Sequence, residues 1–155
     1  MTSRILPILG LVLAITALGV LFWSYSSPEI TIMPTRTLLI DGTAVHVAVA
    51  NTPESRAKGL SGTSSLAEGE GMLFVFDDDD RHMFWMKDMV FSIDILWADR
   101  DGRVVHIEQS VSPETFPQTF APPVPARYAL EVPAGFAAAR DIKIGSVLKV
   151  SQVSP

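Results

Sequence analysis

Two hydrophobic patterns divide the chain. Residues 5–23 are nineteen consecutive uncharged side chains, mostly Leu, Ile, Val and Ala. A helix of that length spans about 28 Å, close to the hydrocarbon thickness of a bilayer. From residue 35 onward, apolar and polar positions alternate in short runs, which is the period of a half-buried β-strand. The pattern predicts one N-terminal transmembrane helix followed by a β-rich domain.

The N-terminal segment also indicates an orientation. Arg4 is the only charge before the apolar run, so the N-terminus is expected to stay in the cytoplasm and the domain to lie outside it, in the periplasm or beyond. We therefore predict an anchor over 1–27, a tether over 28–34 and a β-rich domain over 35–151. The alternative is a cleaved signal peptide, because Ser24-Tyr25-Ser26 offers a small-x-small cleavage pattern. Both interpretations export the domain.

The first strands of the domain are the most strongly marked. Runs 35–40 and 43–50 are rich in β-branched residues and are joined by Asp41-Gly42, a dipeptide typical of tight hairpins. Asn51-Thr52-Pro53-Glu54 then predicts the start of a short helix, with a capping side chain and proline in the first turn, and Gly59 is expected to end it.

Further along, the pattern predicts more short strands and few helices. The expected strands are 72–76, 83–86, 91–98, 103–109, 126–132 and 146–150. Asp77–Asp80 is expected to be a solvated turn, 113–125 a proline-rich surface loop, and 134–140 a helix of one or two turns. Within 126–132, alternation predicts that Leu130 points inward and Glu131 outward. The fold class is a compact β-barrel-like or sandwich domain with one or two short helices.

Composition narrows the function further. The chain has 155 residues, enough for one domain, and no cysteine, which excludes disulfides, thiolate nucleophiles and Cys-bound zinc. Its 17 acidic and 12 basic side chains give a net charge of −5. Nucleic acid is not expected as a partner, because binding to a phosphate backbone requires clustered positive charge.

Several motifs in a fixed order resemble a known family. They are Arg56-x-x-Gly59-Leu60, Gly71-Met72-Leu73-Phe74-x-Phe76, Phe84-Trp85-Met86-Lys87, Asp94-Ile95-Leu96, Pro113 and Leu130-Glu131-x-x-Ala134-Gly135. The chain resembles the bacterial and archaeal family named domain of unknown function 192 over roughly residues 36–150. The resemblance implies a small β-barrel-like domain, often exported or anchored, with no established activity. This chain departs from the family pattern at Ser61, where methionine is usual, and at Asp88-Met89, where asparagine-threonine is usual.

The charged residues of these motifs are the candidates for function. We predict a ligand-binding corner made by Arg56, Trp85, Lys87, Asp88 and Glu131, with the proline loop as its rim. The protein would then be a membrane-tethered, non-enzymatic binding or accessory module of the cell envelope, with a polar small molecule or an envelope protein as partner. The alternative is a hydrolase of an envelope polymer that uses Asp94 and Glu131 as its acid and base.

Metal handling is a further alternative. Met83, Met86 and Met89, with His82 beside them, carry ligands that suit monovalent copper, but residues three apart on a strand face opposite ways. The carboxylates of Asp77–Asp80 suit calcium, but no glycine-punctuated ligand pattern follows them. We assign no metal ligand and no cofactor from the sequence.

Overall fold

The computed structural model describes residues 35–149, which belong to one compact unit. The predicted anchor (1–27) and tether (28–34) lie outside the described residues, and no helix within 35–149 is long and apolar enough to cross a membrane. The described strands are β1 (Thr35–Ile40), β2 (Thr43–Ala50), β3 (Glu70–Asp80), β4 (Phe84–Trp85), β5 (Ile93–Ala98), β6 (Val104–Val111), β7 (Thr119–Phe120), β8 (Ala126–Pro133) and β9 (Leu148–Lys149). The helices are α2 (Pro53–Lys58), α3 (Phe136–Ala139) and the 3-10 helix η1 (Pro113–Thr115).

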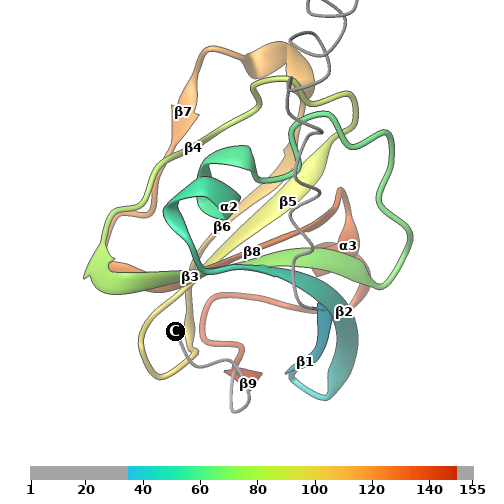
Figure 1. Cartoon of the computed structure of the whole chain (residues 1–155). Helices are drawn as coiled ribbons and strands as arrows, with labels where there is room; N and C mark the ends of the chain where they lie inside the picture. Colours follow the sequence, from blue (N-terminus) through green and yellow to red (C-terminus); the bar gives the residue numbers. More distant parts are fainter. Residues whose placement is uncertain (1–34, 150–155) are drawn as a thin grey trace, which may run out of the picture. The chain divides into compact units, whose positions relative to one another are not determined.

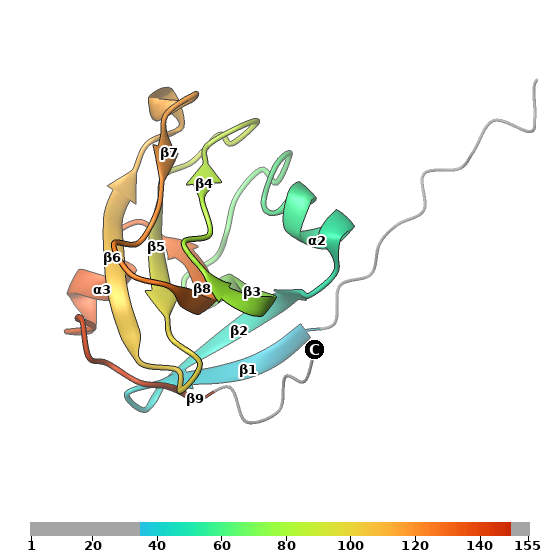
Figure 2. The same ribbon diagram turned by 90° about the vertical axis from the view of Figure 1, so that its left-hand side faces the viewer.

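Seven of these strands form one curled sheet in the order β6-β5-β8-β3-β2-β1-β9, and β4 pairs with β7 in a separate ribbon (Figure 1). The curl brings the two edges together at one end, where Leu148 N–H donates to Gly102 O at 2.7 Å and Val104 N–H donates to Ser146 O at 2.8 Å (Figure 2). The predicted β class with two short helices is confirmed. The sequence predicted either a barrel-like or a sandwich domain. The structure is a half-barrel, because one sheet curls on itself instead of two sheets stacking on each other.

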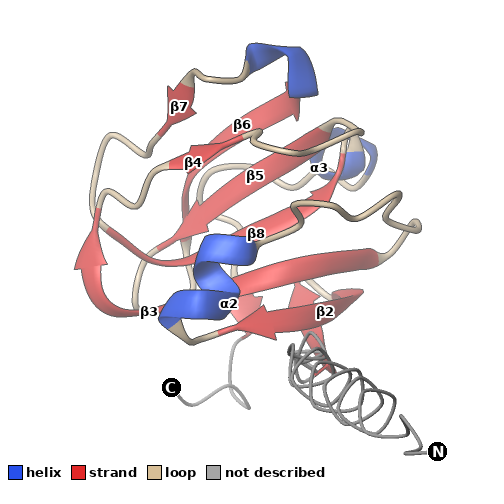
Figure 3. Cartoon of the chain, turned by 45° about the horizontal axis from the view of Figure 1, so that its top comes forward, coloured by secondary structure: helices blue, strands red, loops and turns tan. Residues whose placement is uncertain are grey.

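The first hairpin and helix form as their residues predict. Asp41 and Gly42 both have positive φ, 46° and 86°, as the hairpin turn requires. Thr52 caps α2 by accepting from the backbone N–H of Ser55, and Gly59 follows the helix with φ 50°. The helix connects β2 to β3, which pair in parallel, so α2 is the crossover of a βαβ unit. This crossover places α2 over one face of the sheet, beside β3 and β8 (Figure 3).

Both faces of the sheet are covered, so the central strands are buried on both sides. One face carries a core that includes Leu130, Val132 and Leu148, and the opposite face carries a second core that includes Ala129, Phe84 and Trp97. All six residues of β5 are buried. The prediction that Glu131 points outward is therefore wrong. Alternation along β8 separates two buried faces instead of a core from solvent.

Three other predicted elements also need correction. Asp77–Asp80 is the end of strand β3 instead of a turn, because Asp80 pairs with Ala126 beyond a bulge. The proline-rich stretch contains η1 and also strand β7, which pairs with β4 outside the main sheet. The last strand, predicted over 146–150, is described only as Leu148–Lys149.

Candidate functional site: a pocket over a buried acid

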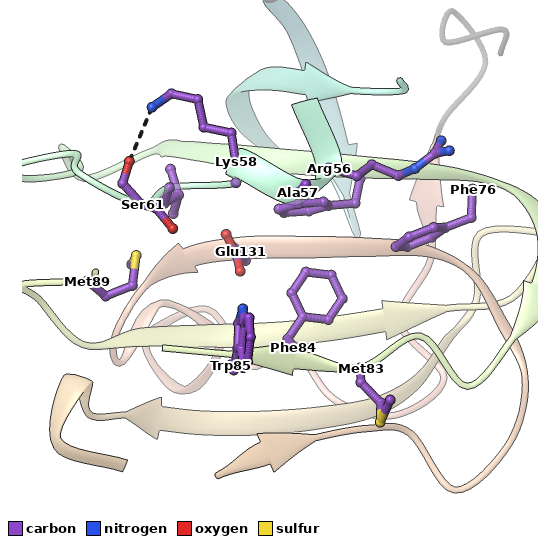
Figure 4. A pocket seen from close by; sticks show the side chains of 13 residues that line it. Arg56, Ala57, Lys58, Ser61, Phe76, Met83, Phe84, Trp85, Met89 and Glu131 are labelled. Atoms are coloured by element: carbon purple, nitrogen blue, oxygen red, sulfur yellow. Dashed lines mark hydrogen bonds between the residues drawn. The ribbon is translucent and has the colours of Figure 1, made fainter. Parts of the chain in front are cut away.

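A pocket of about 390 Å³ lies between α2, β3 and the β4 ribbon, above the central strand β8 (Figure 4). Its walls are aromatic rings, aliphatic groups and two thioethers, and its polar groups are few. The lining residues are Arg56, Ala57, Lys58, Gly59, Leu60, Ser61, Phe74, Phe76, Met83, Phe84, Trp85, Met89 and Glu131. A concave, largely apolar volume of this size is typical of a small-molecule site.

The aromatic wall follows from local strand geometry. Phe74 and Phe76 are two residues apart on β3, so both point to the same face of the sheet. Phe84 of β4 meets Phe74 edge-to-face, with ring centroids 4.8 Å apart. Pairing with β7, at Phe84 with Phe120 and Trp85 with Thr119, holds β4 in this position.

Glu131 lies at the centre of the pocket, where β8 passes beneath α2 (Figure 4). Glu131 is 6% exposed, and its Oε2 atom is buried without a hydrogen-bond partner in the described part of the chain. Burial in this apolar site disfavours the charged form and raises the pKa of the Glu131 carboxyl from 4.5 to about 8. At neutral pH the Glu131 side chain is therefore an uncharged acid, which can donate one hydrogen bond and accept others.

Arg56 lines the pocket, but its guanidinium is already bound within the protein. It donates to Val75 O at 2.8 Å and to Asn51 O at 3.1 Å, and it pairs with Asp77 at 3.1 Å. Two of these three acceptors are backbone carbonyls, one directly after β2 and one within β3. Arg56 therefore fastens α2 to β3 and supports one wall of the pocket.

The other predicted corner residues divide into two groups. Trp85 is 52% exposed and lines the pocket, whereas the side chains of Lys87 and Asp88 do not line it. The Lys87 ammonium lies 5.9 Å from the centre of the Trp85 ring, within cation–π range. The structure thus brings Arg56, Trp85 and Glu131 into one pocket and leaves Lys87 and Asp88 beside it.

The departures from the family pattern meet at one end of this pocket. Ser61 Oγ donates to Lys87 O at 2.9 Å, and Gly62 N–H donates to Asp88 O at 3.0 Å. Ser61 and Met89 both line the pocket. Ser61 and Met89, two of the three residues that differ from the usual pattern, therefore contribute to its surface, where they can change which ligand fits.

Asp94 lies on the opposite face of the sheet from Glu131. In the pairing of β5 with β8, Asp94 is opposite Val132 while Ile95 is opposite Glu131. Asp94 is fully buried and accepts backbone N–H bonds from Ser110 at 2.8 Å, Gly135 at 3.1 Å and Ala137 at 3.0 Å. The two carboxylates do not share a cleft, and Asp94 holds the loop before α3 against β5 and β6.

The residues considered for metal binding do not converge. Met86 is 1% exposed in the core, while Met83 and Met89 lie at opposite ends of the pocket. The carboxylates of Asp77 and Asp79 are paired with arginines. Within residues 35–149, no three His, Asp or Glu side chains are grouped so that they could hold a metal ion.

Sequence reasoning missed most of the pocket wall. Leu60, Phe74 and Phe76 have the pattern of ordinary core residues, and nothing in their spacing marks them as lining a cavity. A usable signal was present in Phe74 and Phe76, which lie two apart in a strand that precedes an exposed apolar pair, Met83 and Trp85. An apolar strand face that continues onto exposed apolar residues indicates an incompletely filled surface.

Comparison with known proteins agrees with this architecture. The model of the family domain of unknown function 192, described as "Uncharacterized ACR", matches residues 36–150, and the chain belongs to this family. No curated protein matches the chain.

Two solved structures share the fold. A protein of unknown function from Novosphingobium aromaticivorans DSM 12444 is 26% identical with a TM-score of 0.73, over 80% of this chain and 91% of that one. A protein from Sinorhizobium meliloti 1021, which carries the name of a suggested transcription regulator, is 25% identical with a TM-score of 0.73, over 79% of this chain and 97% of that one.

Proposed function

We propose that the domain is a non-enzymatic binding module that takes a small ligand into the pocket between α2 and β4. The observation that carries the proposal is Glu131, which lines the pocket and whose Oε2 atom is buried and unpartnered within the described chain. A buried polar atom without a partner destabilises a fold by about 1–3 kcal/mol. A ligand that bonds to this atom would recover that free energy, so the pocket favours an occupant.

The position of Asp94 supports binding over hydrolysis. A hydrolase with two catalytic carboxylates requires them about 5–10 Å apart across one open cleft. Asp94 is on the other face of the sheet with three backbone donors, and Glu131 is the only acid among the lining residues. The pocket therefore offers one acid and no acidic partner for it.

The name of the Sinorhizobium protein refers to transcription, so nucleic acid has to be considered as a ligand of this chain. This chain carries a net charge of −5. Four of its arginines, Arg56, Arg100, Arg127 and Arg140, are paired with carboxylates in the described structure. Cations already paired within the protein gain less from phosphate contacts, so these features favour a ligand other than nucleic acid.

We further propose that the apolar segment 5–23 holds this module on the outer side of a membrane, in the cell envelope. The proposal rests on the sequence alone, through the length of the segment and the single positive charge before it. Because the chain has no cysteine, a cysteine introduced at exposed Ser65 should react with a membrane-impermeant maleimide in intact cells. A cysteine at Ser3 should not, and the reverse labelling would overturn this orientation.

The binding proposal can be tested with a block at the mouth of the pocket. We expect some members of a small-fragment library to raise the melting temperature of the full-length protein. Ser61→Phe should abolish these shifts by filling the pocket, and Ser65→Phe, in the same loop but outside the lining, should preserve them. A library without hits, or hits that survive Ser61→Phe, would contradict the proposal.

A further inference from the structure

The aromatic walls around Glu131 favour one class of ligand over others. Phe74, Phe76, Phe84 and Trp85 enclose the space above the acid from β3 and β4. An aromatic ring presents negative charge on its face and attracts cations in a desolvated site, whereas a neutral amide or alcohol gains much less from it. Rings together with one acid form a surface that complements an ammonium group.

The cations near the pocket do not oppose this choice. Arg56 and Lys58, both from α2, are the positive side chains among the lining residues. The Arg56 guanidinium is bonded to Asp77 and two carbonyls and lies 5.6 Å from the centre of the Phe76 ring, so a ligand cation relies on the other rings. The Lys58 ammonium lies 3.4 Å from Ser61 O and points away from Glu131 (Figure 4). On the β4 side, the Lys87 ammonium lies 5.9 Å from the centre of the Trp85 ring and outside the lining.

We infer that the pocket binds a small organic cation, with an ammonium group at Glu131 and an apolar stem between the aromatic rings. The inference rests on the proposed binding function and specifies its ligand. The pocket volume of about 390 Å³ accommodates a compact amine with one ring. The acid lies at the floor and the partly exposed Trp85 at the mouth, so the ammonium group enters first.

Binding of a cation has a proton balance that distinguishes it from binding of a neutral ligand. At neutral pH, Glu131 enters the reaction as a carboxylic acid and leaves it as a carboxylate paired with the ammonium group. Its proton passes to the buffer, and the ligand keeps its own charge. Each ammonium bound therefore releases up to about one proton, whereas a neutral ligand bonded to the uncharged acid releases none.

Four probes of nearly equal size and shape separate these cases. They are 2-phenylethylammonium, 2-phenylethanol, 3-phenylpropanamide and 3-phenylpropanoate, and each is titrated into the full-length protein by calorimetry at neutral pH. We expect the ammonium to bind at least about tenfold more tightly than the others. The released proton is taken up by the buffer. The apparent binding enthalpy of the ammonium should therefore differ between phosphate and Tris by roughly the difference between the ionisation enthalpies of the two buffers.

Two variants locate the effect. Glu131→Gln keeps the shape of the side chain but cannot ionise, so it should weaken ammonium binding by at least about tenfold and abolish proton release. Glu114→Gln, at an exposed acid on η1 outside the pocket, should change neither.

Failure of this inference differs from failure of the proposed function. Binding of the alcohol, the amide or the propanoate as tightly as the ammonium, or ammonium binding without proton release, would overturn the cation assignment and leave the binding module in place. If none of the four probes binds and the fragment library also gives no hits, both proposals fail.

Discussion

Two buried carboxylates lie one register position apart on neighbouring strands, and they are in opposite situations. Asp94 on β5 faces the core beneath α3 and accepts three backbone N–H bonds. Glu131 on β8 faces the pocket beneath α2, and its Oε2 atom has no partner in the described chain. Both residues are nearly inaccessible, at 0% and 6% exposure. Burial alone therefore does not separate a structural acid from a functional one.

The hydrogen-bond partners of Asp94 and Glu131 distinguish the structural acid from the functional one. Three backbone donors bind Asp94, so its side chain ties the loop before α3 to β6 and is not available to a ligand. Glu131 is buried among the aromatic side chains of the pocket, so its charged form is unfavourable until a partner binds. The same sheet thus carries a structural acid on one face and a candidate binding acid on the other.

Replacing each acid by its amide is the strongest way to test this contrast. Asp94→Asn should lower the free energy of unfolding by about 3 kcal/mol, because the N–H₂ group that replaces one buried carboxylate oxygen is a donor and would face a backbone N–H that needs an acceptor. Denaturant unfolding measures the change. Asp88→Asn, at an exposed aspartate with positive φ, is the matched control and should change stability by less than about 0.5 kcal/mol. Equal effects at both positions would show that Asp94 does not hold the fold.

Glu131→Gln should have the opposite sign, and its effect should depend on pH. The carboxyl ionises near 4.5 in the unfolded chain, whereas its pKa in the fold is about 8. Between these values the folded state keeps a proton that the unfolded state has lost, so wild-type stability falls as pH rises through this window. The variant has no such dependence. Its advantage should grow by up to about 1.4 kcal/mol per pH unit above 4.5, to about 3 kcal/mol at pH 7.

Urea unfolding of both proteins at several values between pH 5 and 8 measures this gap. A constant difference between Gln and Glu is expected from the change in hydrogen bonding, so only the slope with pH is diagnostic. A slope of zero would mean that Glu131 ionises as easily in the fold as in the unfolded chain. The contrast with Asp94 would then disappear.

The sequence predicted the fold well where local chemistry determines it. Asp41-Gly42 and Asn51-Thr52-Pro53-Glu54 mark their elements without help from the rest of the chain, and the hairpin turn and the helix start were predicted there. The sequence left either Asn51 or Thr52 as the cap, and Thr52 is the one that caps α2. The extent of β3 and the existence of β7 were missed, because each depends on a partner strand far away in sequence. Alternation in β8 was correctly recognised, but its meaning depends on α2 and β4 covering the second face.

The site was predicted only in part, for the same reason. Arg56, Trp85 and Glu131 were singled out as charged or aromatic motif residues, and they do meet in the pocket. Asp94 has the same type of side chain and comes from a motif of the same kind. Only the register of β5 with β8 shows that it lies on the other face from Glu131. Sequence identifies which residues carry chemistry, whereas strand pairing decides which of them meet.

Alanine substitutions at two glycines should give the smallest effect and test whether Asp94 holds the loop before α3. Gly69 and Gly135 have nearly equal φ, 82° and 83°, and a Cβ added to either would meet open space. Replacement by alanine should therefore cost about 1 kcal/mol at each from backbone strain alone. Gly135 also donates its N–H to Asp94 at 3.1 Å. Any relief of strain there disturbs this bond, so Gly135→Ala should cost about 0.5 kcal/mol more than Gly69→Ala. In an Asp94→Ala background, which removes the acceptor of the Gly135 bond, the excess should vanish in a double-mutant cycle. Equal costs of the two glycine substitutions in the wild-type background would contradict a loop held by Asp94.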